Sequence, residues 1–249
     1  MTTRQNRWVQ EPPPKHDGLV PYPANARLEV TYLTDPELHA QVLPPPLAPP
    51  PEPRVRVHFT RIEVDGHLHE IVCSFLLDAV YDGGVGQFCA VMPIDLETAV
   101  SPSRETNGEP KKLAQLEFAR EGNHVHASVT RQGVTIIEVV GDVAGTLPVP
   151  APYDVRQFWY KFLPAVSGDG FDAGPFLVTL HQTMKPETCE RVDGKLVLRD
   201  LPGTPVADLP VLELEGSRLM MTSSEFFHVL EDVEIDAAEY ARHVRVQYT

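Results

Sequence analysis

The sequence predicts an α+β fold that is mainly antiparallel β: a single domain with a closed or sandwiched, barrel-like double sheet and a few short helices. Alternating apolar and polar runs fill most of the chain after residue 54. Two tight links, Glu121-Gly-Asn123 and Gln132-Gly133, join three of these runs into an antiparallel meander. The 25 prolines and 16 glycines in 249 residues indicate many turns. So many strands must close or stack to avoid long free edges.

The first part of the chain divides into an arm and the start of the domain. Residues 1–26 form a proline-rich N-terminal arm, and residues 27–249 form the folded domain. Residues 28–32 alternate as a strand does. Thr34 or Asp35 caps a short helix with a proline in its first turn, and Pro44 ends it. The proline-rich segment 44–53 could dock into a partner's aromatic groove, but we favour a stiff connector within the domain.

The remaining elements are mostly strands. We predict strands at residues 55–62, 69–80, 86–93, 113–120, 124–131 and 134–143, and later at 175–185, 187–193, 195–200 and 209–221. Residues 154–163 are aromatic and ambiguous, and residues 223–231 could form a helical turn. The glycine-rich segment 83–86 lacks the strand–loop–helix context of a phosphate-binding loop, so we interpret it as a hairpin loop.

Charge and composition narrow the function. The net charge of −14 disfavours nucleic acids and anionic membranes as partners, and it requires any site for a carboxylate to be local. The cysteines Cys73, Cys89 and Cys189 are odd in number and lack metal-site spacing, which indicates reduced thiols. The chain shows neither a signal peptide nor an apolar run long enough to span a membrane. We therefore expect a cytoplasmic protein.

Lys111 and Lys112 follow Pro110 and are the leading candidates for chemistry. A lysine that attacks a carbonyl must be neutral, whereas a free lysine has a pKa of about 10.4. Making it half neutral at pH 7 costs about 4–5 kcal/mol, which burial or a nearby cation supplies. Adjacent side chains in a strand point to opposite faces, and in a helix they diverge by about 100°. We therefore expect one lysine inside a pocket and the other at its periphery.

The context of the two lysines resembles the acetoacetate decarboxylase family. The resemblance covers roughly residues 27–230. Its most specific part is Pro110-Lys-Lys-Leu113 together with the residues that precede it, Asp95, Glu97, Ala99 and Arg104-Glu105. More modest similarities lie at Thr34-Asp35, at Val42-Leu-Pro44, at Tyr160-Lys-Phe-Leu-Pro164 with Gly168-Asp-Gly170, and at Ala207-Asp-Leu-Pro-Val211.

The resemblance implies a cofactor-free Schiff-base enzyme. Lys111 would attack the ketone of a small β-keto acid, and the protonated imine would accept the electrons released as carbon dioxide leaves. Lys112 would be the cation that perturbs Lys111, and the family is itself a known example of a lysine activated in this way. The family also implies a homo-oligomer and a small-molecule keto acid as substrate.

Three further residues match the family less closely. The family uses an arginine near the N-terminus and glutamates in the strands before the lysines; Arg27 and Glu70 are the candidates here. His58 stands where a second glutamate is expected, and we place it with Arg27 in substrate binding. Because an imidazole and a carboxylate move protons differently, aldol condensation and dehydration through the same lysine stays an alternative reaction.

Two alternatives do not use the lysines for catalysis. His67, His69 and His126 could hold a metal in a β-barrel, since residues two apart in a strand share a face. However, Glu70 points away from His69 and His67 sits in a turn, so we favour solvent-exposed or singly bonded histidines and predict no metal site. The other alternative is a non-catalytic ligand-binding relative that keeps the lysines as surface charge.

Overall fold

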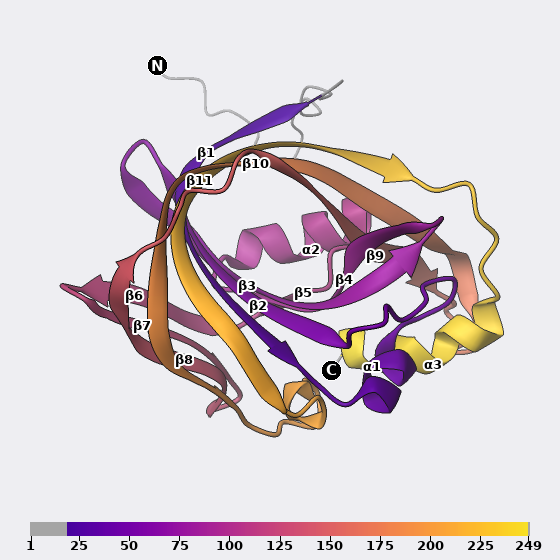
Figure 1. The fold of residues 1–249 in the computed structure, drawn as a ribbon. Helices are drawn as coiled ribbons and strands as arrows, with labels where there is room; N and C mark the ends of the chain where they lie inside the picture. The colour runs from indigo at the N-terminus through magenta and orange to yellow at the C-terminus, as the bar shows by residue number, and fades with distance from the viewer. Residues whose placement is uncertain (1–18, 249) are drawn as a thin grey trace, which may run out of the picture.

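The computed structural model describes residues 19–248, and its strands form one large sheet (Figure 1). The strands are β1 (Val20–Leu33), β2 (Arg54–Val64), β3 (His67–Tyr81), β4 (Gly84–Ile94), β5 (Lys111–Leu113), β6 (Gln115–Glu121), β7 (His124–Arg131), β8 (Val134–Thr146), β9 (Tyr153–Pro164), β10 (Phe171–Leu198) and β11 (Glu213–Leu230). The described part also contains α1 (Pro36–Val42), α2 (Glu97–Asn107), α3 (Ala237–Tyr248) and the 3₁₀ turn η1 (Val206–Asp208).

The sheet closes into a ring. Strands β1 to β4 pair antiparallel in sequence order, and β4 then pairs parallel with β9. Strands β9, β10 and β11 continue antiparallel, and β11 pairs with β1 to complete the circle (Figure 1). The ring order is therefore β11-β1-β2-β3-β4-β9-β10, which leaves its members without long free edges. The predicted fold class is confirmed.

A second layer covers one side of the ring. The far half of β10 pairs with β8, and β8, β7 and β6 form the predicted meander with links at residues 122–123 and 132–133. This meander packs against the outer face of β2 and β3, where the Phe59 and Phe118 rings lie 6.3 Å apart. The largest hydrophobic core lies between the two layers, with Val57, Phe75 and Ile137 buried in it. Polar residues that alternate with this core therefore face the interior of the ring.

The early helix and the proline-rich segment form as the sequence suggests. The Asp35 side chain caps α1 by accepting hydrogen bonds from the backbone N–H groups of Glu37 and Leu38, at 2.9 and 3.0 Å. In the segment 44–53, Leu47 is buried and Ala48 forms a β-bridge with Val80. The segment is thus a connector packed within the domain. Among residues 19–248, no helix is long and apolar enough to cross a membrane.

Several predicted boundaries are wrong. Strand β1 begins at Val20, so residues 20–26 belong to the sheet and not to the arm; residues 1–18 lie outside the described part. Strand β10 is continuous where the sequence predicts three strands. Pro186 has no N–H to donate to β11, and a shift in the register of the two strands at this residue lets β10 continue. Residues 223–230 continue β11 and do not form a helical turn, because β10 pairs with the whole segment and β1 pairs with residues 224–226. Helices α2 and α3 are not among the predicted elements.

Candidate active site

A cavity of about 280 Å³ opens inside the ring. Its walls come from strands of the ring and from the short segment that links α2 to β5. Of the residues singled out in the sequence, Arg27, Glu70 and Lys111 line this cavity. His58 and Lys112 are buried but do not line it. The cavity therefore brings together a cation, a carboxylate and a primary amine contributed by β1, β3 and β5.

The end of α2 places Lys111 at the cavity. The helix stops at Gly108, whose φ of 78° is left-handed, and a Cβ at this position would lie 2.6 Å from the backbone carbon of Tyr160. After Pro110 the chain enters β5, where Lys111 pairs with Met92 of β4 in parallel register. The Arg104 guanidinium also donates to the Lys111 carbonyl at 3.3 Å. Helix, turn and strand thus fix the backbone from which the Lys111 amine projects.

The Lys111 amine has two polar partners. Its Nζ donates to Ser103 Oγ at 3.0 Å and lies 3.1 Å from Glu109 Oε2. The other Glu109 oxygen accepts a hydrogen bond from Asn107 Nδ2 at 3.0 Å, which orients the carboxylate. Glu109 also lines the cavity, and sequence reasoning missed it. Glu109 precedes β5, and the Lys111 N–H donates to the Glu109 carbonyl at 2.7 Å, so a tight turn around Pro110 and not strand alternation sets this contact.

Glu70 contributes a second carboxyl group to the cavity. Burial raises the pKa of Glu70, while the positive charge of Lys111 acts in the opposite direction. Its Oε2 has no hydrogen-bond partner among the described residues. The indole Nε1 of Trp159, which also lines the cavity, is buried without a partner in the same part of the chain. Both groups are therefore available to a bound ligand.

Lys112 occupies the opposite face of β5. It is 4% exposed, and its Nζ donates to the carbonyl of Gly203 at 2.9 Å. Burial, with contributions from Arg131 and Arg104, lowers the pKa of Lys112 to about 7. The two lysines diverge as strand geometry requires. Lys112 does not lie at the periphery, however, because it is buried in a separate environment.

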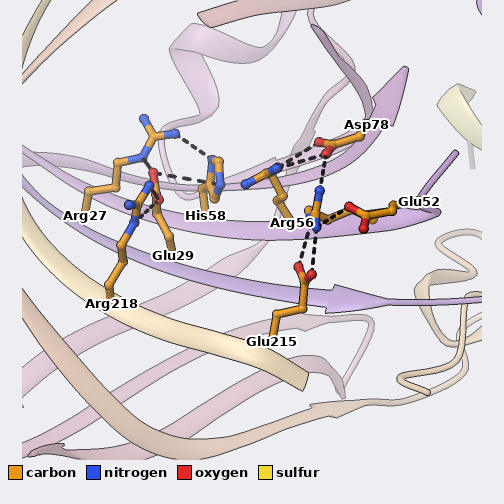
Figure 2. A network of polar contacts seen from close by, with 9 residues as sticks. Arg27, Glu29, Glu52, Arg56, His58, Asp78, Glu215 and Arg218 are labelled. Atoms are coloured by element: carbon orange, nitrogen blue, oxygen red, sulfur yellow. Dashed lines mark hydrogen bonds and ion pairs between the residues drawn. The ribbon is translucent and has the colours of Figure 1, made fainter. Parts of the chain in front are cut away.

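Arg27 is held from behind by His58 and Glu29 (Figure 2). Its guanidinium donates to His58 Nδ1 at 2.6 Å, and its Nε lies 2.8 Å from Glu29 Oε1. Burial, followed by the charge of Arg27, holds the pKa of His58 well below its usual value, so the ring is neutral and accepts at Nδ1. The structure thus places His58 where it orients Arg27, outside the cavity wall.

Glu29 also links Arg27 to Arg218. Its second oxygen accepts from Arg218 at 2.7 Å. Burial would raise the pKa of Glu29, but the guanidinium groups of Arg27 and Arg218 hold it at about 2. A second, separate group of ion pairs lies farther from the cavity (Figure 2), and it joins Arg56 to Asp78 and Arg54 to Asp78, Glu52 and Glu215. Paired charges therefore fill the ring beyond Arg27.

The histidines considered as metal ligands lie outside the cavity. His124 contacts Asp142 at 3.2 Å, and His126 lies between Glu117 and Glu138 at 3.5 and 3.7 Å. His67 and His69 are exposed at the start of β3. Across residues 19–248, no three His, Cys, Asp or Glu side chains are grouped so that they could hold a metal ion.

Comparison with known proteins identifies the family. The model of the acetoacetate decarboxylase family matches residues 6–233, which is most of the chain. The chain belongs to the acetoacetate decarboxylase family. Among curated relatives, acetoacetate decarboxylase of Burkholderia ambifaria (strain MC40-6) is 26% identical over 224 residues, which cover 85% of this chain and 84% of the relative. The corresponding protein of Bordetella avium (strain 197N) is 27% identical over 211 residues, covering 76% and 78%.

Solved structures of acetoacetate decarboxylases and their relatives share the fold. Acetoacetate decarboxylase from Legionella pneumophila superposes with a TM-score of 0.76 at 20% identity, covering 92% of both chains. The enduracididine biosynthesis enzyme MppR, in complex with the condensation product of pyruvate and imidazole 4-carboxaldehyde, superposes with a TM-score of 0.68 at 18% identity, covering 83% and 87%. Membership of the family supports an enzyme that acts on a small molecule.

Proposed function

We propose that this chain is a Schiff-base decarboxylase that converts a small β-keto acid into a ketone and carbon dioxide without a cofactor. The observation that carries the proposal is that Lys111 shares one cavity with Arg27, Glu70 and Glu109. An amine, a cation for the substrate carboxylate and two carboxyl groups for proton transfer are the groups that this reaction needs.

Arg27 binds the substrate carboxylate in this mechanism. The chain carries a net charge of −14, so the anion needs a local cation, and Arg27 lines the cavity. Its Nε faces Glu29 and one terminal nitrogen faces His58, which leaves the guanidinium fixed in one orientation. A fixed guanidinium positions a carboxylate at little further entropic cost.

Glu109 manages the proton of the nucleophile. Lys111 attacks the ketone carbon as a neutral amine, so a proton must leave its nitrogen. The Glu109 carboxylate, 3.1 Å away, is placed to accept that proton, and Ser103 stays hydrogen-bonded to the amine. Glu109 then returns the proton to the departing oxygen as water leaves and the protonated imine forms.

The carbon–carbon bond breaks once the imine is in place. Its electron pair moves into the imine and gives an enamine, while carbon dioxide departs. Glu70, whose pKa burial raises, is the acid that protonates the enamine carbon. Water then hydrolyses the new imine, which releases the ketone and restores the Lys111 amine.

Trapping with borohydride tests the nucleophile. Wild-type protein incubated with acetoacetate and sodium borohydride should gain the mass of a reduced adduct, and fragment spectra should place it on Lys111 and not on Lys112. Lys111→Ala should give no adduct, and Lys112→Met, at the neighbouring lysine, is the matched control that should still give one. An adduct that persists in Lys111→Ala would overturn the assignment.

An aldolase or dehydratase that uses the same lysine is the second candidate. The relative MppR supports it, because its bound ligand is a condensation product of pyruvate and an aldehyde. The imidazole at position 58 does not support this second candidate, because His58 contacts Arg27 and does not line the cavity. Measurement of carbon dioxide from acetoacetate, beside product analysis with pyruvate and an aldehyde, separates the reactions. Condensation without carbon dioxide release would favour the second candidate.

A further inference from the structure

The cavity is larger than acetoacetate requires. An apolar cavity of about 150 Å³ is sufficient to bind benzene, and acetoacetate is similar to benzene in size. The cavity beside Lys111 measures about 280 Å³. A molecule the size of acetoacetate would thus leave about 130 Å³ beside the reacting atoms, slightly less than the cavity that holds benzene.

Four rings line part of this cavity and contact one another in a row. Trp159 and His228 have centroids 5.3 Å apart, His228 and Phe226 are 5.6 Å apart, and Phe226 and Tyr22 are 6.1 Å apart. These spacings lie in the range of favourable aromatic contacts. We call these four residues the aromatic wall. Trp159 is buried in a small hydrophobic cluster, whereas Phe226 is only partly buried and His228 is exposed, so the wall runs from this cluster to the opening of the cavity.

The strand register separates the aromatic wall from Arg27. On β1 and β11, Arg27 pairs with Met220, Asn25 with Thr222, and Tyr22 with Ser224. Phe226 and His228 come after Ser224 on β11, so they continue away from Arg27. A substrate carboxylate held by Arg27 therefore directs the rest of the molecule along the cavity toward the wall.

The wall also lies near the carboxyl groups that flank Lys111. Burial, and then the charges of Glu70 and Glu109, raise the pKa of Tyr22 to about 12. Burial lowers the pKa of His228, and the charge of Glu109 acts on it in the opposite direction. The four residues of the aromatic wall line the same cavity as Lys111 and both carboxyl groups. A group attached to the ketone carbon at Lys111 would thus meet the wall.

We propose that the preferred substrate is a β-keto acid with an aromatic ring on its ketone carbon, and that the aromatic wall binds this ring. The proposal rests on the Schiff-base decarboxylation proposed above. In the reaction, one aryl β-keto acid anion and one proton give one aryl methyl ketone and one carbon dioxide. The water lost on imine formation returns on hydrolysis, so no further reactant is needed.

Substrate comparison with the full chain tests the proposal. Carbon dioxide release is measured for 3-oxo-3-phenylpropanoate and for acetoacetate, with Lys111→Ala as the blank for spontaneous decarboxylation. The aromatic acid should show a kcat/KM about tenfold or more above that of acetoacetate. Phe226→Ala should lower this ratio by about tenfold. Phe227→Ala is the matched control, because the Phe227 ring is stacked on His181 and does not line the cavity.

The outcomes separate this proposal from the function on which it rests. Equal or faster turnover of acetoacetate by the wild-type protein would overturn the aromatic substrate and leave the decarboxylase intact. An unchanged substrate ratio in Phe226→Ala would likewise show that the aromatic wall does not bind the ring. If neither acid decarboxylates above the Lys111→Ala blank, the proposed function itself fails. A high wild-type ratio that falls in Phe226→Ala and not in Phe227→Ala supports the proposal.

Discussion

Lys112 should make the stability of the protein depend on pH in a defined direction. Its folded pKa of about 7 lies below the unfolded value of 10.5, so between these values the unfolded chain binds more protons and stability rises with pH. Integrated from about pH 7 to about pH 10, this linkage amounts to about 3 kcal/mol. Urea unfolding of wild-type protein and of Lys112→Met at both pH values measures it. The wild-type free energy of unfolding, minus that of the variant, should increase by this amount.

The comparison isolates one side chain. Methionine keeps most of the volume of Lys112 and removes the amine, so other titrating groups cancel in the difference. Lys195→Met is the control, because the side chain of Lys195 is exposed. The difference in unfolding free energy between wild type and this variant should change by less than about 0.5 kcal/mol between the two pH values. If the free-energy difference between wild type and Lys112→Met changes equally little with pH, burial does not lower the pKa of Lys112.

Three further predictions concern the cavity and its support. Glu109→Gln should lower kcat by about 10²–10³-fold, because the amide cannot accept the Lys111 proton; an unchanged rate of imine formation in rapid-mixing experiments would exclude this role. His58→Leu should raise KM for keto acids more than it lowers kcat, since it frees Arg27; steady-state kinetics showing only a kcat effect would contradict a positioning role. Glu29 has a folded pKa of about 2, below the ordinary value of 4.5, so its stabilisation is present above pH 4.5 and is lost as pH falls toward 2. Urea unfolding should show that wild type loses about 2 kcal/mol more than Glu29→Gln between about pH 5 and about pH 3, and equal losses would count against the linkage.

Short sequence signals are sufficient to predict those parts of the fold in which segments adjacent in the sequence pair with each other. The turns at residues 122–123 and 132–133 set the pairing of β6, β7 and β8, because short hairpin links fix their own register. The cap at Asp35 likewise acts within one turn of helix. Closure of the ring by β10 and β11 joins distant segments, and the sequence indicates closure without giving the strand order.

The wrong predictions of secondary structure have physical causes that a single sequence does not show. Helix α2 has no side-chain cap at its N-terminus, and Pro102 lies inside it, where a proline ordinarily argues against a helix. Residues 223–230 begin with Ser-Ser-Glu, which suggests a helix start, yet pairing with β10 along the segment and with β1 at residues 224–226 holds them in β11. Pro186 suggests a strand end, and a register shift accommodates it instead.

The site is partly accessible from sequence. Strand geometry separates Lys111 from Lys112, and the structure places only Lys111 at the cavity. The contact between Arg27 and His58 depends on the pairing of β1 with β2, which no local pattern reveals. Glu109 lies two residues before Lys111, but its contact with the amine depends on the turn around Pro110 and not on strand alternation.

Borohydride trapping with residue-level mass mapping tests the central claim most directly. The account predicts that a β-keto acid and borohydride give one reduced adduct, located on Lys111, and that Lys112→Met retains it. An adduct on Lys112, or one that remains when Lys111 is replaced by alanine, would contradict the account.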